Sequence, residues 1–463
     1  MDKTIILAAG EGTRMKSKKS KVLHKILNHT ILEYVIEASN LSENSQTIVI
    51  AGNNKEQIEN NFKNIIIRKQ EIGHNIPYGT GYAVSCAKDL IDDDDNILVL
   101  NGDIPLIRKE TLKDFLNSHK QNKMAVSVLS TKLEDPTGYG RIIRDENGNF
   151  SKIVEQKDCL ESQLEVNEIN TGIYAFNGEK LKFALSKLNT NNNQGELYLT
   201  DCIEILKNDN QKVAAFSNLS FEEFFGVNNK FELENAEKIM RMRINKKHMI
   251  DGVILHNPEY ITIDKDAKID IDTEIFAPCS ILGKSEIGKN CVVKSNSRIE
   301  NSKIYDDVII DSSVIEDSVV EKGVDIGPFS HLRPKAHLKE NVHIGNFVEV
   351  KNATVGKNTK AGHLAYVGDA DLGEDINIGC GVIFVNYDGK YKHRSVVEDK
   401  AFIGSNSNIV APVYIEKEGY IAAGSTITKK VHQGELAIER AEEKFIKGYV
   451  EKKKIRDMKR EEK

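Results

Sequence analysis

An aliphatic residue recurs at every sixth position through much of the second half of this chain. A period of six fits neither the stripe of an α-helix nor the simple alternation of a β-strand. It fits a prism of short strands, in which each face supplies one inward aliphatic residue and a turn. The positions that keep step are Ile263, Ile269, Ile275, Ile281, Ile287, Val293 and Ile299, then Ile326, Leu332, Leu338, Ile344 and Val350, and finally Val397, Ile403, Ile409, Ile415, Ile421 and Ile427.

The rhythm breaks most widely over residues 384–396, which contain the run Asn386-Tyr387-Asp388-Gly389. A prism of short strands carries little chemistry by itself, so we expect functional side chains where the period is interrupted. The run Ala361-Gly362-His363 lies shortly before this interruption. With three faces to a turn, the repeat region predicts roughly nine coils and a length of about 45 Å.

The first ~230 residues follow a different pattern, in which apolar strand candidates alternate with stretches of helical spacing. Such alternation predicts a Rossmann-like α/β domain with a mostly parallel sheet, whose ligands lie at the carboxyl ends of the strands. The expected strands are Thr4–Ala9, Thr47–Ala51, Ile65–Arg68, Asn96–Leu100 and Met124–Leu129, and the expected helices are Ile31–Ser39, Thr80–Leu90 and Lys109–Lys120.

Residues 230–250 contain no Gly or Pro and are rich in Glu, Lys, Arg and Met, which predicts a long helix between the halves. We therefore divide the chain into a first domain over 1–229, a linker helix over 230–250 and a second domain over 251–463. The final segment, Glu442–Lys463, is dominated by Lys, Arg and Glu and predicts a solvated helix or tail.

Length and composition limit the classes of protein that fit. At 463 residues the chain exceeds the ~250–300 residues that a single core supports, which predicts at least two domains. The net charge of −6 argues against a nucleic-acid footprint over the whole chain. No stretch approaches the ~20 apolar residues that span a bilayer. The six cysteines form no CxxC pair, so we expect reduced thiols in a cytoplasmic protein.

A glycine-rich loop follows the first expected strand and reads Leu7-Ala8-Ala9-Gly10-Glu11-Gly12-Thr13-Arg14-Met15. Glycine lets the backbone approach a phosphate closely, and backbone N–H groups in such a loop can face anionic oxygens. Arg14 and the later Lys21 add positive charge at the same place. A Gly-x-Gly pair alone fits an ordinary strand-to-helix turn, but the Thr-Arg-Met run and the lysine favour a nucleotide-binding role.

This segment resembles the signature of the sugar nucleotidyltransferases that use nucleoside triphosphates. That family usually has Gly-x-Gly-Thr-Arg-Met followed by Pro-Lys, and here Ser20 replaces the proline while Lys21 keeps the lysine. The resemblance implies that Lys21 and Arg14 are catalytic residues, which hold the developing charge and the pyrophosphate leaving group.

A second part of the resemblance is the run Leu98–Asp103, where an expected strand ends on an acidic residue. The plain alternative is a strand that ends in a solvated turn, but carboxylate oxygens suit Mg²⁺. The resemblance implies that Asp103 and Asn228 hold Mg²⁺. Gly79-Thr80-Gly81 resembles the loop that faces the base, yet His74–Tyr78 stands where the family has a glutamine, and Gln70 is a displaced candidate.

Further matching motifs lie at residues 136–141, at 155, at 170–172 and at 226–229. Each one alone has a common explanation as a turn or a cap, but their order along the domain matches the family. The resemblance implies that UTP and the sugar phosphate contact Leu7, Ala8, Ala9, Gly10, Lys21, Gly79, Thr80, Asn101, Gly102, Asp103, Gly140, Glu155, Asn170 and Asn228.

The second half resembles the hexapeptide-repeat acyltransferases, through Leu332-Arg333-Pro334 and the runs at 346–351, 361–369 and 386–389. The resemblance implies a left-handed parallel β-helix, a hand that the hexads alone do not give. Transfer of an acyl group from a thioester to a sugar amine needs a base of near-neutral pKa, which a histidine supplies. A lone histidine is more often structural, but within this run His363 is the expected catalytic base.

The same resemblance assigns ligand contacts. Cys380 departs from the family, which has a small alanine there, but its backbone N–H remains available to a thioester oxygen. We expect the thiol of Cys380 to make this site sensitive to alkylation. The implied contacts to glucosamine 1-phosphate are Arg333, Lys351, Tyr366, Asn377 and Lys392, and those to acetyl-CoA are Cys380, Asn386, Tyr387, Ser405, Ala423 and Arg440.

Taken together, the two halves resemble the bifunctional bacterial uridylyltransferase–acetyltransferases. The resemblance implies acetylation of glucosamine 1-phosphate by acetyl-CoA, then transfer of UMP from UTP to N-acetylglucosamine 1-phosphate with release of pyrophosphate, for cell-envelope polysaccharide synthesis. It also implies a homotrimer that binds only small-molecule substrates. One alternative is a single-function nucleotidyltransferase with a trimerising β-helix. Another is a structural or binding hexad protein with an inactive first domain.

Overall fold

The computed structural model describes residues 1–73, 76–192, 194–218 and 221–461, so His74 and Asn75 lie outside the described residues. The chain forms two compact units, Met1–Arg243 and Ile244–Lys463. Their boundary falls within the long helix α8 (Lys230–Ile250).

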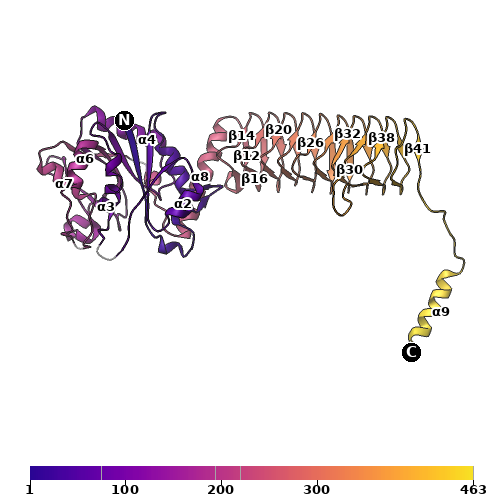
Figure 1. The fold of residues 1–463 in the computed structure, drawn as a ribbon, viewed down its shortest axis with the longest axis horizontal. Coiled ribbons are helices and arrows are strands. Elements are labelled where there is room, and N and C mark those ends of the chain that lie inside the picture. The colour runs from indigo at the N-terminus through magenta and orange to yellow at the C-terminus, as the bar shows by residue number, and fades with distance from the viewer. Residues whose placement is uncertain (74–75, 193, 219–220, 462–463) are drawn as a thin grey trace. The chain divides into compact units, whose positions relative to one another are not determined.

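A mixed sheet forms the centre of the first unit (Figure 1). Its main strand order is β11-β7-β10-β6-β1-β4-β5. All neighbouring pairs in this order are parallel except those of β10, which runs antiparallel to β6 and β7. The expected mostly parallel sheet is therefore confirmed, with one reversed strand inside it. The strands are β1 (Asp2–Ala8), β4 (Gln46–Ala51), β5 (Ile66–Lys69), β6 (Asn96–Asn101), β7 (Val126–Lys132), β10 (Glu168–Asn177) and β11 (Val213–Ser217), with the hairpin β8 (Arg141–Arg144) and β9 (Phe150–Val154) beside β10.

Helices cover both faces of this sheet because successive strand residues point to opposite sides. In β6, Val99 packs into one apolar cluster and Leu98 into the other. The helices on the Val99 side are α3 (Thr80–Ser85), α6 (Gly178–Leu185) and α7 (Asp201–Asn208), and those on the Leu98 side are α1 (Ile31–Ser39), α2 (Lys55–Asn61) and α4 (Lys109–Gln121). The result is the three-layer α/β arrangement that the alternating pattern predicts.

One expected helix is shorter than the prediction. The stretch Thr80–Leu90 forms α3 as far as Ser85 and then a separate 3-10 turn over Lys88–Leu90. The N–H of Leu90 bonds the carbonyl of Ala87, three residues back, so the second piece winds more tightly than an α-helix. Helical spacing of apolar residues does not distinguish one helix from two short ones in line.

Three parallel sheets of eleven, ten and nine short strands enclose the core of the second unit. Each strand pairs with the third strand along the chain, so three strands make one coil (Figure 1). Every aliphatic residue that keeps the six-residue step is buried in one continuous cluster. The parallel β-helix is therefore confirmed, with about one coil more than expected. The sheets run from β12 (Ile254–His256) to β41 (Leu436–Ala437), from β13 (Ile261–Ile263) to β40 (Thr426–Ile427), and from β14 (Lys268–Ile269) to β38 (Tyr414–Ile415).

The slips in the hexad rhythm leave the pairing of inward residues intact. Val293 pairs with Ile310, 17 positions later, and Ile299 pairs with Ile315, 16 positions later. The turns at the corners absorb the missing residues, and many corners hold Asn or Asp in the left-handed region, such as Asn296 with φ 64°. These side chains tolerate that region better than most others do.

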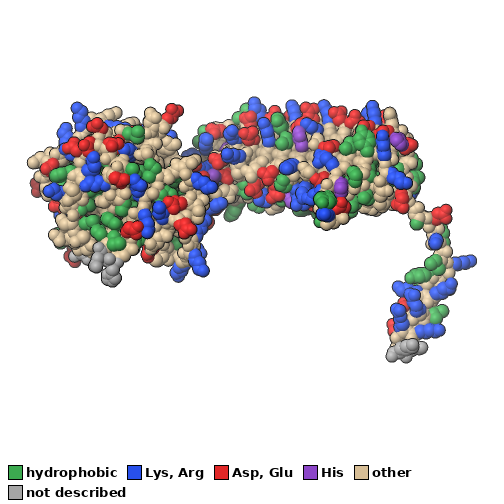
Figure 2. Space-filling view, in the orientation of Figure 1, with side chains coloured by type: hydrophobic (Ala, Val, Ile, Leu, Met, Phe, Trp, Pro, Cys, Tyr) green, Lys and Arg blue, Asp and Glu red, His purple; other side chains and the backbone are tan. Residues whose placement is uncertain are grey.

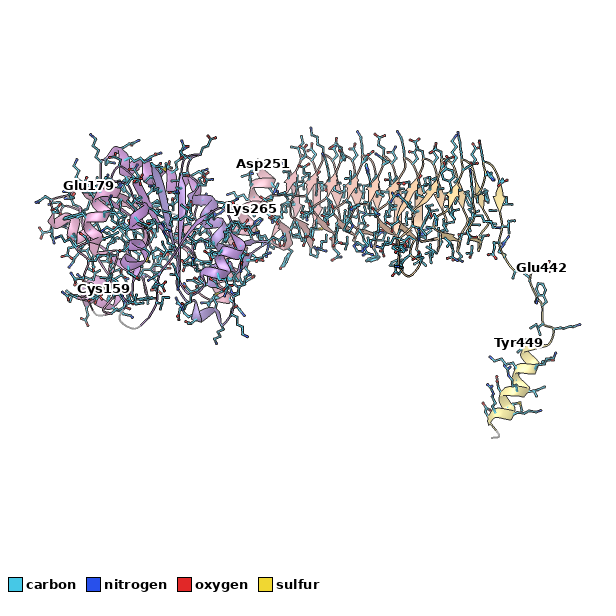
Figure 3. The ribbon with its side chains drawn as sticks, in the orientation of Figure 1. Cys159, Glu179, Asp251, Lys265, Glu442 and Tyr449 are labelled. Atoms are coloured by element: carbon cyan, nitrogen blue, oxygen red, sulfur yellow. The ribbon has the colours of Figure 1, made fainter. Side chains whose placement is uncertain are left out.

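Two segments depart from the prism. The wide interruption forms a loop between β34 (Ile383–Val385) and β35 (Ser395–Val397). Near the end of the chain, α9 (Tyr449–Glu461) has no buried residue, which agrees with the expected solvated helix. Figure 3 labels Glu442 and Tyr449 in this tail. Charged side chains of both signs are spread over the outside of the coils (Figure 2). Among the described residues, no helix is long and apolar enough to cross a membrane.

Candidate functional sites

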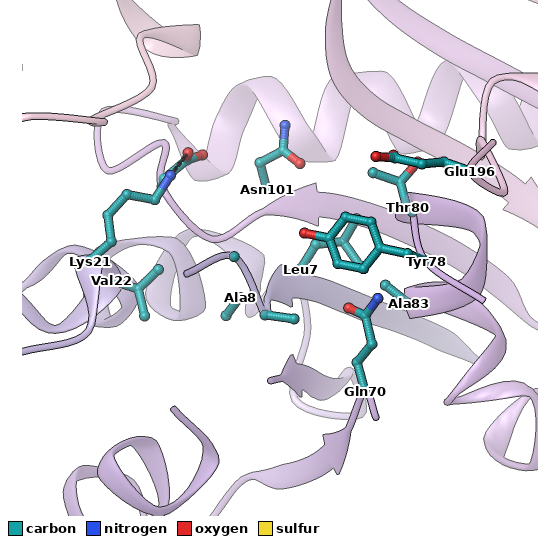
Figure 4. A pocket seen from close by; sticks show the side chains of 14 residues that line it. Leu7, Ala8, Lys21, Val22, Gln70, Tyr78, Thr80, Ala83, Asn101 and Glu196 are labelled. Atoms are coloured by element: carbon teal, nitrogen blue, oxygen red, sulfur yellow. Dashed lines mark hydrogen bonds and ion pairs between the residues drawn. The ribbon is translucent and has the colours of Figure 1, made fainter. Parts of the chain in front are cut away.

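A pocket of about 260 Å³ lies at the carboxyl ends of β1 and β6, where a parallel sheet is expected to bind its ligand. Figure 4 shows Asn101, Thr80, Tyr78 and Gln70 facing it from different sides. The sequence-predicted residues among its lining are Leu7, Ala8, Ala9, Gly10, Lys21, Gly79, Thr80, Asn101 and Asp103. Gly102 is buried behind the pocket, where its N–H donates to the carbonyl of Leu7.

Charged and polar side chains from three distant parts of the first unit meet beside this pocket. The ammonium of Lys21 lies 2.5 Å from Oδ2 of Asp103 and 3.2 Å from Oδ1 of Asn228. Arg14 also donates to Oδ1 of Asn228, over 3.0 Å. The backbone holds the cluster together, because the N–H of Val227 donates to the carbonyl of Asp103. The four residues that the sequence singles out here are thus connected, Lys21 to Asp103 and Asn228, and Arg14 to Asn228.

The Asp103–Asn228 pair fits a divalent cation. Two oxygen atoms, one from a carboxylate and one from an amide, converge on a single positive group, the ammonium of Lys21. Oxygen donors of this kind are those that Mg²⁺ prefers, and Mg²⁺ commonly completes its shell with water and phosphate oxygens. The geometry therefore offers a cation position, which Lys21 fills in this structure.

Glycine is required at one position of the loop. Gly12 has φ 62°, and a Cβ there would lie 2.7 Å from Cβ of Lys21. A larger residue would displace the lysine from Asp103. A second cavity of about 510 Å³ adjoins the first and is lined by residues 10–14 together with Lys21 and Asn228. The glycine-rich loop thus borders open space on the side where Arg14 and Lys21 place positive charge.

The three residues expected to contact the sugar also lie together, although none of them lines the first pocket. The N–H of Asn170 donates to the carbonyl of Gly140, and a Cβ on Gly140 would lie 3.4 Å from a carboxylate oxygen of Glu155. Burial raises the pKa of Glu155, and nearby Asp158, Asp201 and Glu196 add to that effect. Glu196 lines the first pocket, so it connects the two groups.

In the second unit, three of the expected phosphate contacts converge. Nearby Lys392 and Arg333 lower the pKa of Lys351, because like charges disfavour its protonated form. Nη1 of Arg333 lies 2.7 Å from Oε1 of Glu349. This ion pair raises the pKa of Arg333, and nearby Tyr366 adds to that effect. Asn377 lies on a different face: it begins β33 (Asn377–Ile378), which pairs with β30 (Lys360–His363) and not with the strand of Lys351.

His363 is exposed at the end of β30, and its Nδ1 lies 2.9 Å from Oδ1 of Asn346. An amide oxygen can only accept a hydrogen bond, so this contact holds the proton on Nδ1 and leaves the lone pair of Nε2 free. Asn346 ends β27 (His343–Asn346), and the register pairs it directly with His363 one coil later. The arrangement leaves Nε2 of this exposed side chain as the atom that can accept a proton.

One edge of the prism carries most of the expected acetyl-CoA contacts. The strand register pairs Ala361 with Ile378, Ile378 with Ile403, and Ile403 with Ile421. The residues two positions after these four therefore lie in line, and they are His363, Cys380, Ser405 and Ala423. Backbone bonds continue along this edge, from Asn406 to Cys380 and from Gly424 to Ser405. Within the described chain, the N–H groups of Cys380, Ser405 and Ala423 donate no hydrogen bond, and all three residues are exposed. Arg440 lies beside Gly424 at the end of this edge.

Comparison with known proteins identifies the family. The chain is 49% identical to "Bifunctional protein GlmU" of Clostridioides difficile (strain 630) over 455 residues, which cover 98% of each protein. The relatives of the same name from Alkaliphilus oremlandii and Thermoanaerobacter pseudethanolicus are 46% and 45% identical and cover 97% of this chain and 98% of their own length. The chain belongs to the GlmU family of bifunctional proteins. In addition, residues 3–222 match the nucleotidyl transferase family model.

Within this GlmU-family chain the interrupting loop is firmly built. The carboxylate of Asp388 accepts hydrogen bonds from the N–H groups of Lys390 and Tyr391 and contacts His393, which together lower the pKa of Asp388 to about 2. Arg394 holds the end of the loop to Asp371. At its start, Asn386 is buried and donates to Asp369 and to the hydroxyl of Tyr366. Tyr387, in contrast, is exposed.

Tyr78 and Glu196 escape the sequence argument for a GlmU-family member, whereas Gln70 is its displaced candidate for the base-reading glutamine. Gln70 is buried and lines the nucleotide pocket together with Tyr78 and Glu196. Gln70 carries a weak signal, since it directly follows β5, which pairs with β4 at the same edge of the sheet, but Tyr78 and Glu196 carry none. The position of Asn346 could be predicted from the repeat, because it lies one coil before His363 and the register pairs the two residues.

Proposed function

We propose that this chain catalyses two reactions in the synthesis of UDP-N-acetylglucosamine, each at its own site. Its second unit acetylates glucosamine 1-phosphate with acetyl-CoA, and its first unit transfers UMP from UTP to N-acetylglucosamine 1-phosphate, releasing pyrophosphate. The observation that carries the proposal is the presence of two separate constellations of functional side chains. One is Lys21 with Arg14, Asp103 and Asn228, and the other comprises His363 held by Asn346 and the cations around Lys351.

Acetyl transfer begins with attack of the sugar amine on the thioester carbonyl. The N–C bond forms, the C–S bond breaks, and the coenzyme leaves as its thiol. Nε2 of His363 accepts the proton that the amine loses, because Nδ1 is committed to Asn346, and this proton then passes to the departing sulfur. Arg333, Lys351 and Lys392 hold the phosphate of the sugar, where their mutual repulsion is relieved by its negative charge.

The open N–H groups along the acetyl edge support binding of coenzyme A there. We assign the N–H of Cys380 to the thioester oxygen, where a donor stabilises the charge that develops in the transition state. Ser405, Ala423 and Arg440 then follow along the coenzyme, with Asn386 and Tyr387 at the loop. Because the thiol of Cys380 is exposed, we expect its alkylation to abolish acetyl transfer.

Uridylyl transfer is an in-line displacement at the α-phosphorus of UTP by a phosphate oxygen of the sugar. The new P–O bond forms as the bond to pyrophosphate breaks, so positioning and charge neutralisation supply most of the rate. Lys21 and Arg14 hold the triphosphate and the departing pyrophosphate. Asp103 and Asn228 would hold Mg²⁺, which supplies further neutralisation of phosphate charge. Gln70 contacts the base and Gly140, Glu155 and Asn170 the sugar.

We further propose that the chain works as a cytoplasmic homotrimer, with domains at 1–229 and 251–463 joined by the helix over 230–250. Phe329 and Phe347 stack with ring centres 5.7 Å apart at one corner of the prism, and both are mostly exposed together with Leu364. Such an apolar corner suits contact with another copy. Asn377, which lies away from the Lys351 cluster, then contributes to the site of a neighbouring copy.

The test uses the full chain with glucosamine 1-phosphate, acetyl-CoA, UTP and Mg²⁺, and follows free thiol and pyrophosphate separately. We expect both products, with pyrophosphate release depending on prior thiol release. If the prism is only a trimerising module, pyrophosphate appears with N-acetylglucosamine 1-phosphate but no thiol appears with the amine. If the first unit is inactive, thiol appears without pyrophosphate.

A further inference from the structure

A cleft of about 600 Å³ lies in the first unit at the amino-terminal edge of the sheet. Asn96 at the start of β6, Ala125 just before β7 and Lys212 just before β11 form part of its wall. The nucleotide pocket lies at the other end of β6, beside Asn101, which is about 17 Å away along the strand. The two linings share no residue. This cleft therefore belongs to neither site described above.

The charge of the cleft is strongly positive. Four lysines line it, against one acidic residue, Glu179 (labelled in Figure 3). Lys120 is paired with Asp2 and Lys180 with Glu179. Within the described parts of the chain, Lys123 and Lys212 have no ion pair or side-chain hydrogen bond, and both are exposed. We refer to Lys120, Lys123, Lys180 and Lys212 together as the lysine cleft.

Helix ends explain only part of this charge. Lysines commonly follow the carboxyl end of a helix because they interact favourably with its dipole, and Lys120 and Lys123 stand at the end of α4. Lys180 instead lies in the first turn of α6, where the dipole disfavours a positive charge, and Lys212 precedes a strand. Two of the four lysines thus lie where no helix dipole accounts for them.

The walls of the cleft are preformed. The N–H of Ala125 donates to the carbonyl of Lys212, and the N–H of Asn177 donates to the carbonyl of Ala125. His119 is almost fully buried at the cleft wall, with Nδ1 2.8 Å from the hydroxyl of Ser127. Burial, with the neighbouring charge of Lys120, lowers the pKa of His119 to about 4, so the ring is neutral at physiological pH. Because backbone hydrogen bonds already order these walls, the protein loses little conformational entropy when a ligand binds there.

We propose that the lysine cleft binds an anionic, phosphate-bearing small molecule at a site distinct from both catalytic centres. The volume lies within the ~300–1,000 Å³ typical of small-molecule sites. Lys123 and Lys212 lack partners among the described side chains and supply the charge for the ligand, while the amides of Asn96 and Asn177 line the same space. The ligand binds at the edge opposite the nucleotide pocket.

Equilibrium dialysis of the full chain with labelled inorganic phosphate tests this proposal. The lysine-cleft variant is Lys123→Gln/Lys212→Gln, and the matched control is Lys109→Gln/Lys113→Gln, which removes the same charge from exposed positions of α4. We expect the wild type and the control to bind one more phosphate per chain than the cleft variant, or to bind it at least about 10-fold more tightly.

Phosphate also reaches the catalytic sites, so the difference between variants is the measured quantity. Both catalytic activities, assayed without added phosphate, should be unchanged in the two variants, which shows that they are folded. Equal phosphate binding by the cleft variant and the wild type overturns the proposal. Equal loss in the cleft variant and the control also overturns it, because the effect would then be one of net charge.

Discussion

The two units assemble their sites in opposite ways. In the α/β unit, Lys21, Asp103 and Asn228 are separated by up to 207 positions and meet because three strands or loops end at one edge of a sheet. In the prism, Asn346, His363 and Cys380 follow each other at intervals of one coil and lie in line along one edge. A sheet gathers side chains by topology, whereas a β-helix gathers them by repetition.

This difference affects how each site responds to change. Contacts in the α/β unit depend on loops that several elements hold in place, so Lys21 connects three segments through its contacts with Asp103 and Asn228. Contacts in the prism join residues of neighbouring coils, which lie one full turn apart in the sequence. The stacked aliphatic residues of the core fix the register of these coils. A substitution at either site should therefore affect one reaction and spare the other.

The largest effect is expected for His363→Ala. General-base catalysis contributes about 10²–10⁴-fold, so acetyl transfer should fall by that factor while acetyl-CoA binding changes little. Thiol release and binding of acetyl-CoA, measured on one preparation, check this. His337→Ala is the matched control, because His337 pairs with Glu321 on another face of the prism. An unchanged kcat in folded His363→Ala would remove this histidine from the mechanism.

Asp103→Asn should lower uridylyl transfer by about 10²–10³-fold, since it removes one charge from the group that holds cation and phosphates. The substitution keeps the size of the side chain, and acetyl transfer should stay near the wild-type rate. Pyrophosphate release measured over a Mg²⁺ titration should require more Mg²⁺. If both activities fall together, the substitution damages folding and the separation of the two sites is not supported.

Asn346→Ala should lower acetyl transfer by about 10-fold, because partners that orient a functional side chain typically contribute that much. kcat should fall while KM changes little, since Asn346 acts through His363. Asn346→Asp should restore most of the rate, because a carboxylate oxygen also accepts the hydrogen bond from Nδ1. Failure of this rescue, with normal folding, would mean that the contact does not orient the imidazole.

Asp201→Asn should give the smallest effect, a rise of about 2–4 °C in Tm at pH 7. Burial raises the pKa of Asp201 from 3.8 to about 6, with Glu204 and Asp158 adding to it. The native state therefore holds more protons than the unfolded state between pH 4 and 6, and stability is lost as pH rises through that window. The variant should flatten this dependence in thermal unfolding, whereas Asp114→Asn, on the exposed side of α4, should not. Parallel curves for Asp201→Asn and the wild type would contradict the assignment.

The sequence predicts the prism better than the α/β unit, and the reason is physical. Each inward position of the prism has the same neighbours one coil away, so a single period specifies the whole core. The pairing of Val293 with Ile310 shows that even the slipped coils keep this rule. In the α/β unit, the reversed direction of β10 and the break after Ser85 depend on contacts between distant segments, which no local pattern records.

The candidate sites show the same contrast. Motifs identify Lys21, Asp103 and His363, because each chemistry demands a particular residue type at a strand end or an interruption. Tyr78 and Glu196 line the nucleotide pocket because their two distant loops are joined, the N–H of Leu197 donating to the carbonyl of Tyr78, so their positions in the sequence do not predict it. The resemblance assigns Asn377 and Lys351 to the same ligand, and only the structure shows that the coil register places them on different faces of this chain.

The edge that carries His363, Cys380, Ser405 and Ala423 has a fixed pitch, because neighbouring parallel strands are about 4.8 Å apart. Three coils therefore separate His363 from Ala423 by about 14 Å, whatever the side chains between them. The wide loop after Val385 adds residues without adding a layer. Insertions at the corners of the prism can thus change surface loops freely, while the span offered to a long, extended ligand changes only by whole coils.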